Sequence, residues 1–133
     1  MNTLPDTLCY LNGEYLPLNE AKVSVLDRGF VFGDGVYDVA PAYGLRLFRF
    51  DEHMARLERG LSRIRIPNPH TREQWLERCR RLVAALHAKT GVEDQVVYIQ
   101  VTRGVAPRDH VMPEHIVPTV FMMANPMKHP SAD

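Results

Sequence analysis

The chain has little of what marks several common protein classes. Its 133 residues include two cysteines and one tryptophan, and 16 basic side chains balance 16 acidic ones. Balanced charge argues against binding to nucleic acid or to a membrane surface, because both depend on an excess of Lys and Arg. No segment reaches the about 20 apolar residues that a transmembrane helix needs. The composition therefore predicts a globular protein that contacts neither nucleic acid nor membrane.

The sequence also gives no indication of a disulfide-bonded, secreted or metal-binding protein. Cys9 and Cys79 show no disulfide-framework spacing, so we expect reduced thiols in a cytoplasmic protein. Residues 1–15 lack a basic stretch followed by an apolar run, so they are not expected to be a signal peptide. No histidine is spaced with cysteines or acids as metal ligands are, which predicts that the protein has no metal site.

Alternating and turn-forming residues predict strands in the first third of the chain. Asn12-Gly13 between short apolar pairs is typical of a hairpin turn. Residues 36–43 alternate, and Pro41 places this strand at a sheet edge or at a bulge. Gly44 then turns the chain into residues 45–50, which we expect to be the hairpin partner.

Two helices and two further strands follow. Asp51 is expected to cap a helix that ends near Ile64, and Thr71 with Gln74 forms a capping box for a second helix that runs to about Lys89. Residues 95–103 and 118–124 read as strands, separated by a long loop over residues 104–117. Short links between strands favour antiparallel pairing. The predicted fold is therefore α+β, a mainly antiparallel sheet with two helices.

The glycine-rich segment at residues 27–37 is the most informative local feature. It contains three glycines before Tyr37 and reads as a loop that leads into a strand. Loops on a rigid scaffold often carry binding residues, so Tyr37 is a candidate substrate contact. The alternative is a buried phenol whose hydroxyl is bonded to the backbone.

A second candidate site lies in the long loop. Arg108 and His110, beside the stiff Pro107, could hold a substrate carboxylate through the two-pronged guanidinium. The alternative is a solvated loop in which Asp109 neutralises Arg108. Arg56 admits a similar choice between a solvated position on its helix and a phosphate contact.

Covalent catalysis by a lysine is not expected from these residues. A catalytic lysine needs a desolvated or electrostatically depressed amine. Lys22, Lys89 and Lys128 lie in a polar stretch, at a helix end and in the tail, respectively.

Taken together, six segments resemble the fold-type IV, or class IV, pyridoxal-phosphate aminotransferases. The matching segments occur in the family's order and at its spacing: Tyr10-Leu-Asn-Gly13, Asp27-Arg-Gly29, Phe32-Gly-Asp-Gly-Val-Tyr37, Leu47-Phe48, Glu52-His-Met-Ala-Arg56 and Gln100-Val-Thr-Arg-Gly104. The Arg-x-His arrangement after Thr-Arg-Gly is similar to the D-amino-acid aminotransferase branch.

This resemblance implies roles for four residues. Arg56 would bind the phosphate of pyridoxal 5'-phosphate, whereas Tyr37, Arg108 and His110 would hold the substrate α-carboxylate. The loop of Arg108 would reach into the neighbouring subunit of a homodimer. The implied reaction converts a D-amino acid and 2-oxoglutarate into a 2-oxo acid and D-glutamate. Asp38 stands where the family usually has Glu.

The resemblance also implies that the chain is the N-terminal part of a longer enzyme. Residues 1–124 would be the small N-terminal domain and residues 125–133 the start of an interdomain linker. The lysine that binds the cofactor covalently would lie beyond Asp133, so these residues alone should be inactive. A branched-chain aminotransferase, an aminodeoxychorismate lyase and a non-catalytic self-associating domain are the alternatives.

Overall fold

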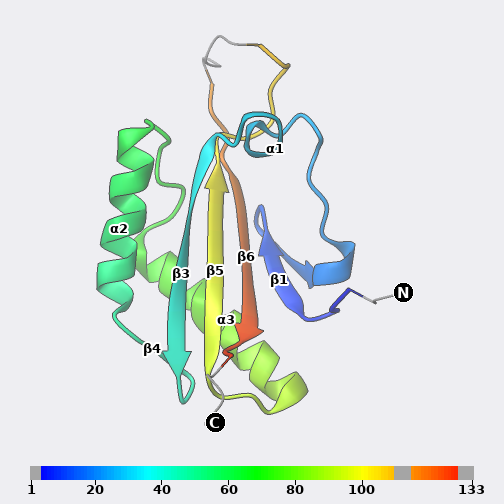
Figure 1. The fold of residues 1–133 in the computed structure, drawn as a ribbon, viewed down its shortest axis with the longest axis vertical. Helices are drawn as coiled ribbons and strands as arrows, with labels where there is room; N and C mark the ends of the chain where they lie inside the picture. The colour runs from blue at the N-terminus through cyan, green and yellow to red at the C-terminus, as the bar shows by residue number, and fades with distance from the viewer. Residues whose placement is uncertain (1–3, 110–114, 129–133) are drawn as a thin grey trace.

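A single antiparallel sheet organises the chain (Figure 1). The computed structural model describes residues 4–109 and 115–128. Its six strands follow the spatial order β2 (Glu14–Pro17), β1 (Leu8–Leu11), β6 (Thr119–Pro126), β5 (Gln95–Thr102), β3 (Gly35–Tyr43) and β4 (Arg46–Leu47). All five pairings are antiparallel. The α+β prediction is therefore confirmed.

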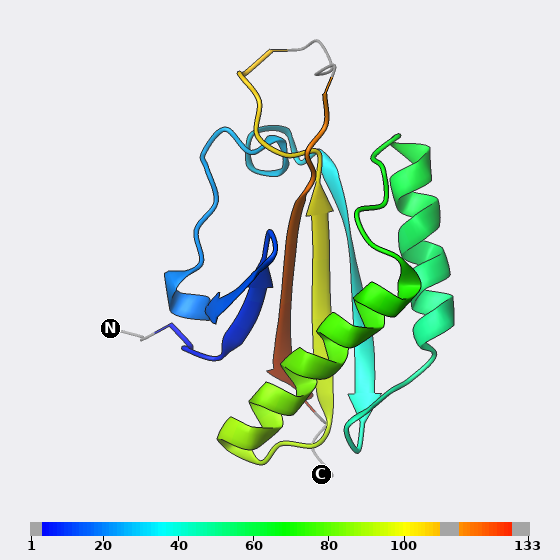
Figure 2. The same cartoon turned by 180° about the vertical axis from the view of Figure 1, so that it is seen from behind.

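Two long helices cover one face of the sheet (Figure 2). They are α2 (Phe50–Arg63) and α3 (Arg72–Thr90), and both contribute to the core. The largest fully buried side chain is Trp75 of α3, which packs in one cluster with side chains of α2 and with the helix-facing residues of β5 and β6. The opposite face of the sheet carries no long helix in the described part of the chain (Figure 1).

The predicted capping box and hairpin turn are both present. The Thr71 hydroxyl accepts from the Gln74 N–H at 3.2 Å, and the Gln74 side chain accepts from the Thr71 N–H at 2.9 Å. This helix ends at Gly91, which has a left-handed conformation. Asn12 and Gly13 have φ values of 50° and 93°, as a tight β-hairpin requires.

Pro41 was predicted to mark an edge strand or a bulge, but β3 is the second strand from the edge, because β4 lies beyond it. β5 pairs with the whole length of β3, whereas β4 pairs only with Ala42 and Tyr43 on the other side. The C=O of Pro41 faces away from β5, because it accepts from the Phe48 N–H at 2.9 Å. A proline at this position therefore removes no hydrogen bond from the ladder with β5.

Several predicted boundaries were wrong. α2 begins at Phe50 after Arg49, so Asp51 lies in the first turn and is not the N-cap. Arg49 is the N-cap in a left-handed conformation, two residues earlier than the pattern indicated. Residues 45–50 contribute only the two-residue strand β4, and β6 continues to Pro126.

The glycine-rich segment is not simply a loop. It contains the short helix α1 (Arg28–Phe32), which is capped by the Asp27 side chain and ended by Gly33 at φ 65°. A 3-10 turn, η1 (Leu18–Glu20), precedes it. The described part of the long loop, residues 104–109 and 115–117, contains no helix or strand, but Val105 forms an isolated bridge with Asp27.

Candidate active site

Arg56 is exposed but not simply solvated. It projects from α2 toward Asp38 of β3, and its Nε donates to Asp38 Oδ2 at 3.2 Å while its Nη2 pairs with Asp38 Oδ1. The Arg56 side chain is 62% exposed and that of Asp38 is 1% exposed. A buried carboxylate thus fixes one edge of an otherwise open guanidinium. Its Nη1 has no hydrogen-bond partner among the residues that the structure describes, and can serve an anionic ligand.

Asp38 is held as an anion by three neighbours. Burial alone would raise its pKa, but hydrogen bonds from Arg56, the Val39 N–H and His53 outweigh this and lower the pKa of Asp38. The Val39 N–H lies 2.7 Å from Asp38 Oδ1, and His53 Nδ1 lies 3.3 Å from the same oxygen. The hydrogen bond to Asp38 raises the pKa of Arg56 in return, so this pair keeps its charges across the physiological range.

Tyr37 and Arg56 line the same groove. It runs between β3 and α2, and its lining consists of Gly35, Val36, Tyr37, Asp38, Val39, Arg56, Leu57, Arg59, Gly60 and Arg63. Tyr37 is 69% exposed, so the buried-phenol alternative is wrong. Its ring stacks on Tyr98 of β5 with centroids 5.8 Å apart and planes 20° apart. The phenol is therefore held against the sheet while its surface is available to a ligand.

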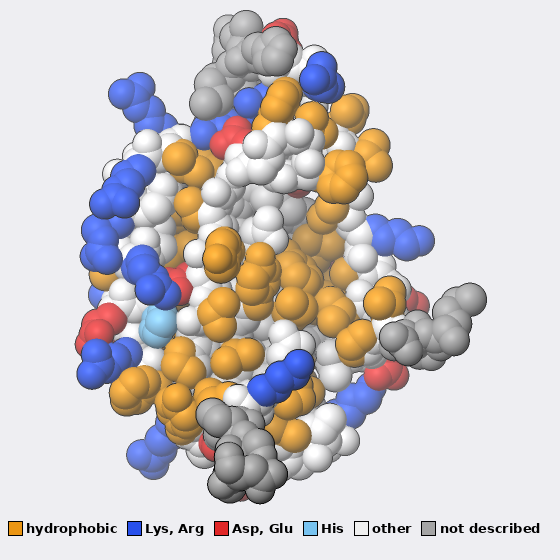
Figure 3. Space-filling model, viewed as in Figure 1, with side chains coloured by type: hydrophobic (Ala, Val, Ile, Leu, Met, Phe, Trp, Pro, Cys, Tyr) orange, Lys and Arg blue, Asp and Glu red, His pale blue; other side chains and the backbone are white. Residues whose placement is uncertain are grey.

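The open face of the sheet around Tyr37 is apolar. Val39 and Tyr43 of β3 are 37% and 48% exposed, and Tyr98 continues to Phe121 of β6 with centroids 6.3 Å apart. Figure 3 shows this hydrophobic surface across the middle of the molecule. It borders the groove of Tyr37 and Arg56, so a ligand in the groove would lie beside an apolar wall.

Arg108 lies beside α1. Its guanidinium carbon is 5.6 Å from the centroid of the Phe32 ring, and that of Arg28 is 4.8 Å from the same ring. Arg28 also donates from Nη1 to the backbone C=O of Asp109 at 3.1 Å, which ties the loop to α1. The other predicted residue of this loop, His110, lies outside the described residues.

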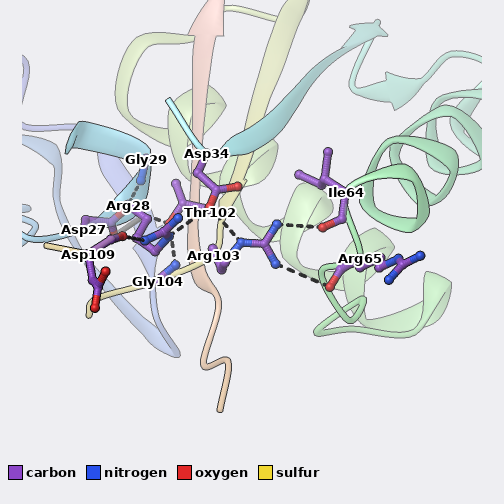
Figure 4. A network of polar contacts seen from close by, with 10 residues as sticks. All are labelled: Asp27, Arg28, Gly29, Asp34, Ile64, Arg65, Thr102, Arg103, Gly104 and Asp109. Atoms are coloured by element: carbon purple, nitrogen blue, oxygen red, sulfur yellow. Dashed lines mark hydrogen bonds and ion pairs between the residues drawn. The ribbon is translucent and has the colours of Figure 1, made fainter. Parts of the chain in front are cut away.

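Asp27 holds α1 and the long loop at one end of the sheet (Figure 4). Its side chain accepts from the Gly29 N–H at 2.8 Å, from Thr102 Oγ1 at 2.7 Å and from Thr119 Oγ1 at 2.5 Å. The residue is 2% exposed. It therefore joins α1, β5 and β6, the elements from which the glycine-rich segment and the long loop extend.

Asp34 forms a second, partly buried centre between two arginines. Its Oδ2 accepts from Arg28 Nε at 3.0 Å and from Arg103 Nε at 2.7 Å. Arg103 also donates to the C=O of Ile64 at 2.6 Å, which connects this centre to the end of α2 (Figure 4). Burial would raise the pKa of Asp34, but the hydrogen bonds and charges of Arg103 and Arg28 lower it.

The structural roles of four charged residues could not be predicted from the sequence: Asp27, Arg28, Asp34 and Arg103. Each was noted only as part of a motif. The one signal available was the occurrence of charged residues next to glycines in two motifs, Asp27-Arg-Gly29 and Thr102-Arg-Gly104. A Cβ on Gly29 would lie 2.3 Å from Thr102 Cγ2, so the glycine permits the contact between these two motifs.

Comparison with known proteins places the chain in a family. The model of amino-transferase class IV matches residues 35–133. The chain belongs to the class IV aminotransferase family. The chain is 42% identical over 116 residues to D-alanine aminotransferase of Staphylococcus haemolyticus. This alignment covers 87% of the chain and 40% of the relative. The chain is 39% identical over 105 residues to D-alanine aminotransferase of Listeria monocytogenes. This alignment covers 78% of the chain and 35% of the relative.

Solved structures of the family share the fold. Branched-chain amino acid aminotransferase from Escherichia coli matches 92% of the class IV chain with a TM-score of 0.80 at 22% identity, over 41% of its own length. 4-Amino-4-deoxychorismate lyase from Pseudomonas aeruginosa matches 92% with a TM-score of 0.74 at 28% identity, over 42% of its length. The chain thus spans about 40% of the length of these relatives.

The described residues contain neither a membrane-spanning helix nor a group of metal ligands. No helix within residues 4–109 and 115–128 is long and apolar enough to cross a membrane. No group of three or more His, Cys, Asp or Glu side chains in the same ranges is arranged to hold a metal ion.

Proposed function

We propose that this chain is the N-terminal part of a pyridoxal-phosphate-dependent D-amino-acid transaminase. The observation that carries the proposal is the shared groove of Arg56 and Tyr37, with Arg56 fixed along one edge by the buried Asp38. The curated relatives named D-alanine aminotransferase support the D-amino-acid branch. The substrates would be a D-amino acid and 2-oxoglutarate, and the products a 2-oxo acid and D-glutamate.

The groove fits the phosphate of the cofactor. The Nη1 edge of Arg56 faces away from the nitrogens that Asp38 engages, and guanidinium binds phosphate oxygens in a two-pronged geometry. A related aminotransferase structure from Mycobacterium tuberculosis is described as a pyridoxal-phosphate-bound form and matches 90% of this chain with a TM-score of 0.69. When bound, the cofactor would supply the electron-withdrawing ring that makes the substrate α-proton acidic.

Tyr37, Arg108 and His110 would orient the substrate through its carboxylate. Tyr37 offers an exposed phenol beside the Arg56 groove. Arg108 sits against Phe32 on a loop whose backbone Arg28 holds at Asp109, so the loop could present the guanidinium to a site in a neighbouring subunit. The proposal accordingly includes a homodimer, located in the cytoplasm.

Residues 1–124 would form the small domain and residues 125–133 the beginning of the interdomain linker. The cofactor lysine would belong to a second domain beyond Asp133. A chain without that lysine should have no transaminase activity. Incubation with pyridoxal phosphate followed by borohydride should leave no specific lysine adduct and no turnover, and finding both would refute the proposal.

A branched-chain aminotransferase and an aminodeoxychorismate lyase are the competing functions, favoured by the structural matches to those two enzymes. The decisive experiment assays the protein encoded by the complete reading frame with D-alanine, L-leucine and aminodeoxychorismate in parallel. We expect D-alanine to be preferred. A preference for L-leucine would overturn the assignment of the carboxylate-binding residues.

The exposed side chains of Tyr37, Val39 and Tyr43 favour one function of another class, a non-catalytic domain that associates with itself. Sequencing downstream of the codon for Asp133 separates the two. A continuing frame with a second domain supports the enzyme, and a stop codon directly after Asp133 supports the self-associating domain.

A further inference from the structure

Three arginines of α2 line the groove beside β3. Arg56, Arg59 and Arg63 follow one another at intervals of three and four residues, which places them along one side of the helix. Seven residues of helix span about 10 Å along its axis. Figure 3 shows basic side chains gathered along the edge of the molecule that α2 occupies. The groove is therefore bordered by a row of positive charge that ends at Arg56.

This row is not neutralised within the groove. Asp38 is the one acidic residue among the lining residues, and it is already paired with Arg56. No carboxylate in the described part of the chain forms a salt bridge with Arg59 or Arg63. The whole chain has a formal net charge of zero, so this excess is local.

The opposite wall of the groove is the outer edge of β3. The Val39 N–H bonds to the Asp38 side chain and the Pro41 C=O accepts from Phe48, so both face away from β5. Because N–H and C=O groups of alternate residues in an antiparallel strand point to the same side, those of Tyr37 face the groove as well. An anion in the groove would meet guanidinium groups on one wall and a strand edge on the other.

We propose that Arg59 and Arg63 form an entry path that guides the phosphate of the cofactor along α2 to Arg56. The inference rests on the proposed function, and it assigns to these two arginines a task distinct from the grip of Arg56. Like charges along a protein groove raise the local concentration of an anion and thereby its association rate. Arg59 and Arg63 should therefore affect how fast the cofactor binds more than how tightly it is held.

The test measures the association rate of pyridoxal phosphate with the apoprotein of the complete enzyme by stopped-flow absorbance. The variants are Arg59→Gln, Arg63→Gln and the double substitution, and Arg80→Gln on the exposed side of α3 is the matched control. At an ionic strength of ~10 mM, removing one charge about 10 Å from a dianion should slow association about two- to three-fold. The double variant should be about five-fold slower, and Arg80→Gln unchanged.

Two further probes separate steering from structural damage. Pyridoxal lacks the phosphate, so its association rate should be the same in all these proteins. Arg59→Lys preserves the charge and should restore the rate, and ~1 M salt, with a screening length of about 3 Å, should abolish the differences. Equal rates for all variants at low salt, or equal slowing of pyridoxal and pyridoxal phosphate, would overturn the proposal.

Failure of the proposed function can be recognised separately. Arg56→Gln should raise the dissociation constant of pyridoxal phosphate at least ten-fold because it removes a charged, two-pronged hydrogen bond. If Arg56→Gln binds normally, the cofactor assignment fails whatever Arg59 and Arg63 do. If Arg56→Gln binds weakly while the double variant associates at the normal rate, the cofactor assignment stands and the entry path is refuted.

Discussion

Replacing Asp27 should destabilise the fold more than replacing any exposed acid. Asp27 is 2% exposed and accepts three hydrogen bonds, from Gly29 N, Thr102 Oγ1 and Thr119 Oγ1. Asp27→Ala removes the acceptor, the cap of α1 and the link between β5 and β6 at once. The loss should appear as a lower free energy of unfolding for the 133-residue chain.

The magnitude follows from the burial of the partners. A hydrogen bond to a charged group contributes about 1.5–3 kcal/mol, and a buried donor left without a partner costs about 1–3 kcal/mol. The three bonds share one carboxylate, and the two threonine hydroxyls can rotate, so their contributions do not add fully. We expect Asp27→Ala to lower the free energy of unfolding by about 3–5 kcal/mol, a large part of the about 5–15 kcal/mol of a typical domain.

Urea unfolding followed by circular dichroism measures this change. Asp27→Asn keeps the shape and one acceptor oxygen, and should cost about 1–2 kcal/mol, which keeps the comparison possible if Asp27→Ala does not fold. The control is Asp51→Ala, whose side chain is 83% exposed and 3.6 Å from Arg72, and which should change stability by less than about 1 kcal/mol. A loss for Asp27→Ala no larger than that of the control would refute the reasoning.

Two further changes test other contacts. The pKa of Asp38 is lowered in the folded protein, so its stabilising contribution is present above the unfolded pKa of about 3.9 and is lost as the pH falls through the folded value. Asp38→Asn should therefore be less stable than the wild type at pH 7, and urea midpoints should converge as the pH falls below about 4; a constant difference down to pH 2 would contradict this. Gly29→Ala should cost about 1–3 kcal/mol because its Cβ would lie 2.3 Å from Thr102 Cγ2. Ser62→Ala, on the exposed side of α2, is the control in thermal unfolding. Equal unfolding midpoints for Gly29→Ala and Ser62→Ala would show that Thr102 shifts at no cost and would contradict the prediction.

Elements governed by local chemistry were predicted closely. The α3 capping box depends on Thr71 and Gln74, which lie three residues apart, and the β1–β2 turn depends on the positive φ that Asn12 and Gly13 tolerate. α1 was missed because its five residues are too few for a helical period, and its cap bonds to Thr102 and Thr119 far along the chain. The start of α2 was misplaced because the residue that precedes it, Arg49, has a left-handed conformation that no sequence pattern indicated.

The candidate site likewise has features that neighbouring residues determine and features that only long-range contacts determine. Tyr37, Arg56 and Arg108 could be named from motifs, but nothing local showed whether Tyr37 is buried or exposed. Its exposure follows from the two long helices covering only the other face of the sheet. The pairing of Arg56 with Asp38 joins residues 18 positions apart, and the alternation of β3 alone does not reveal which face meets α2.

By itself, the sequence determined the strands and the two long helices, their turns and the family motifs, because each depends on neighbouring residues in the chain. The tertiary structure alone decided that Asp38 is buried under an exposed Arg56, that Asp27 joins three elements, and that the arginines of α2 share a groove with Tyr37. These arrangements depend on how β3, β5 and β6 pair and on which face the helices cover. Burial and charge pairing are set by that packing and not by the order of residues within any one element.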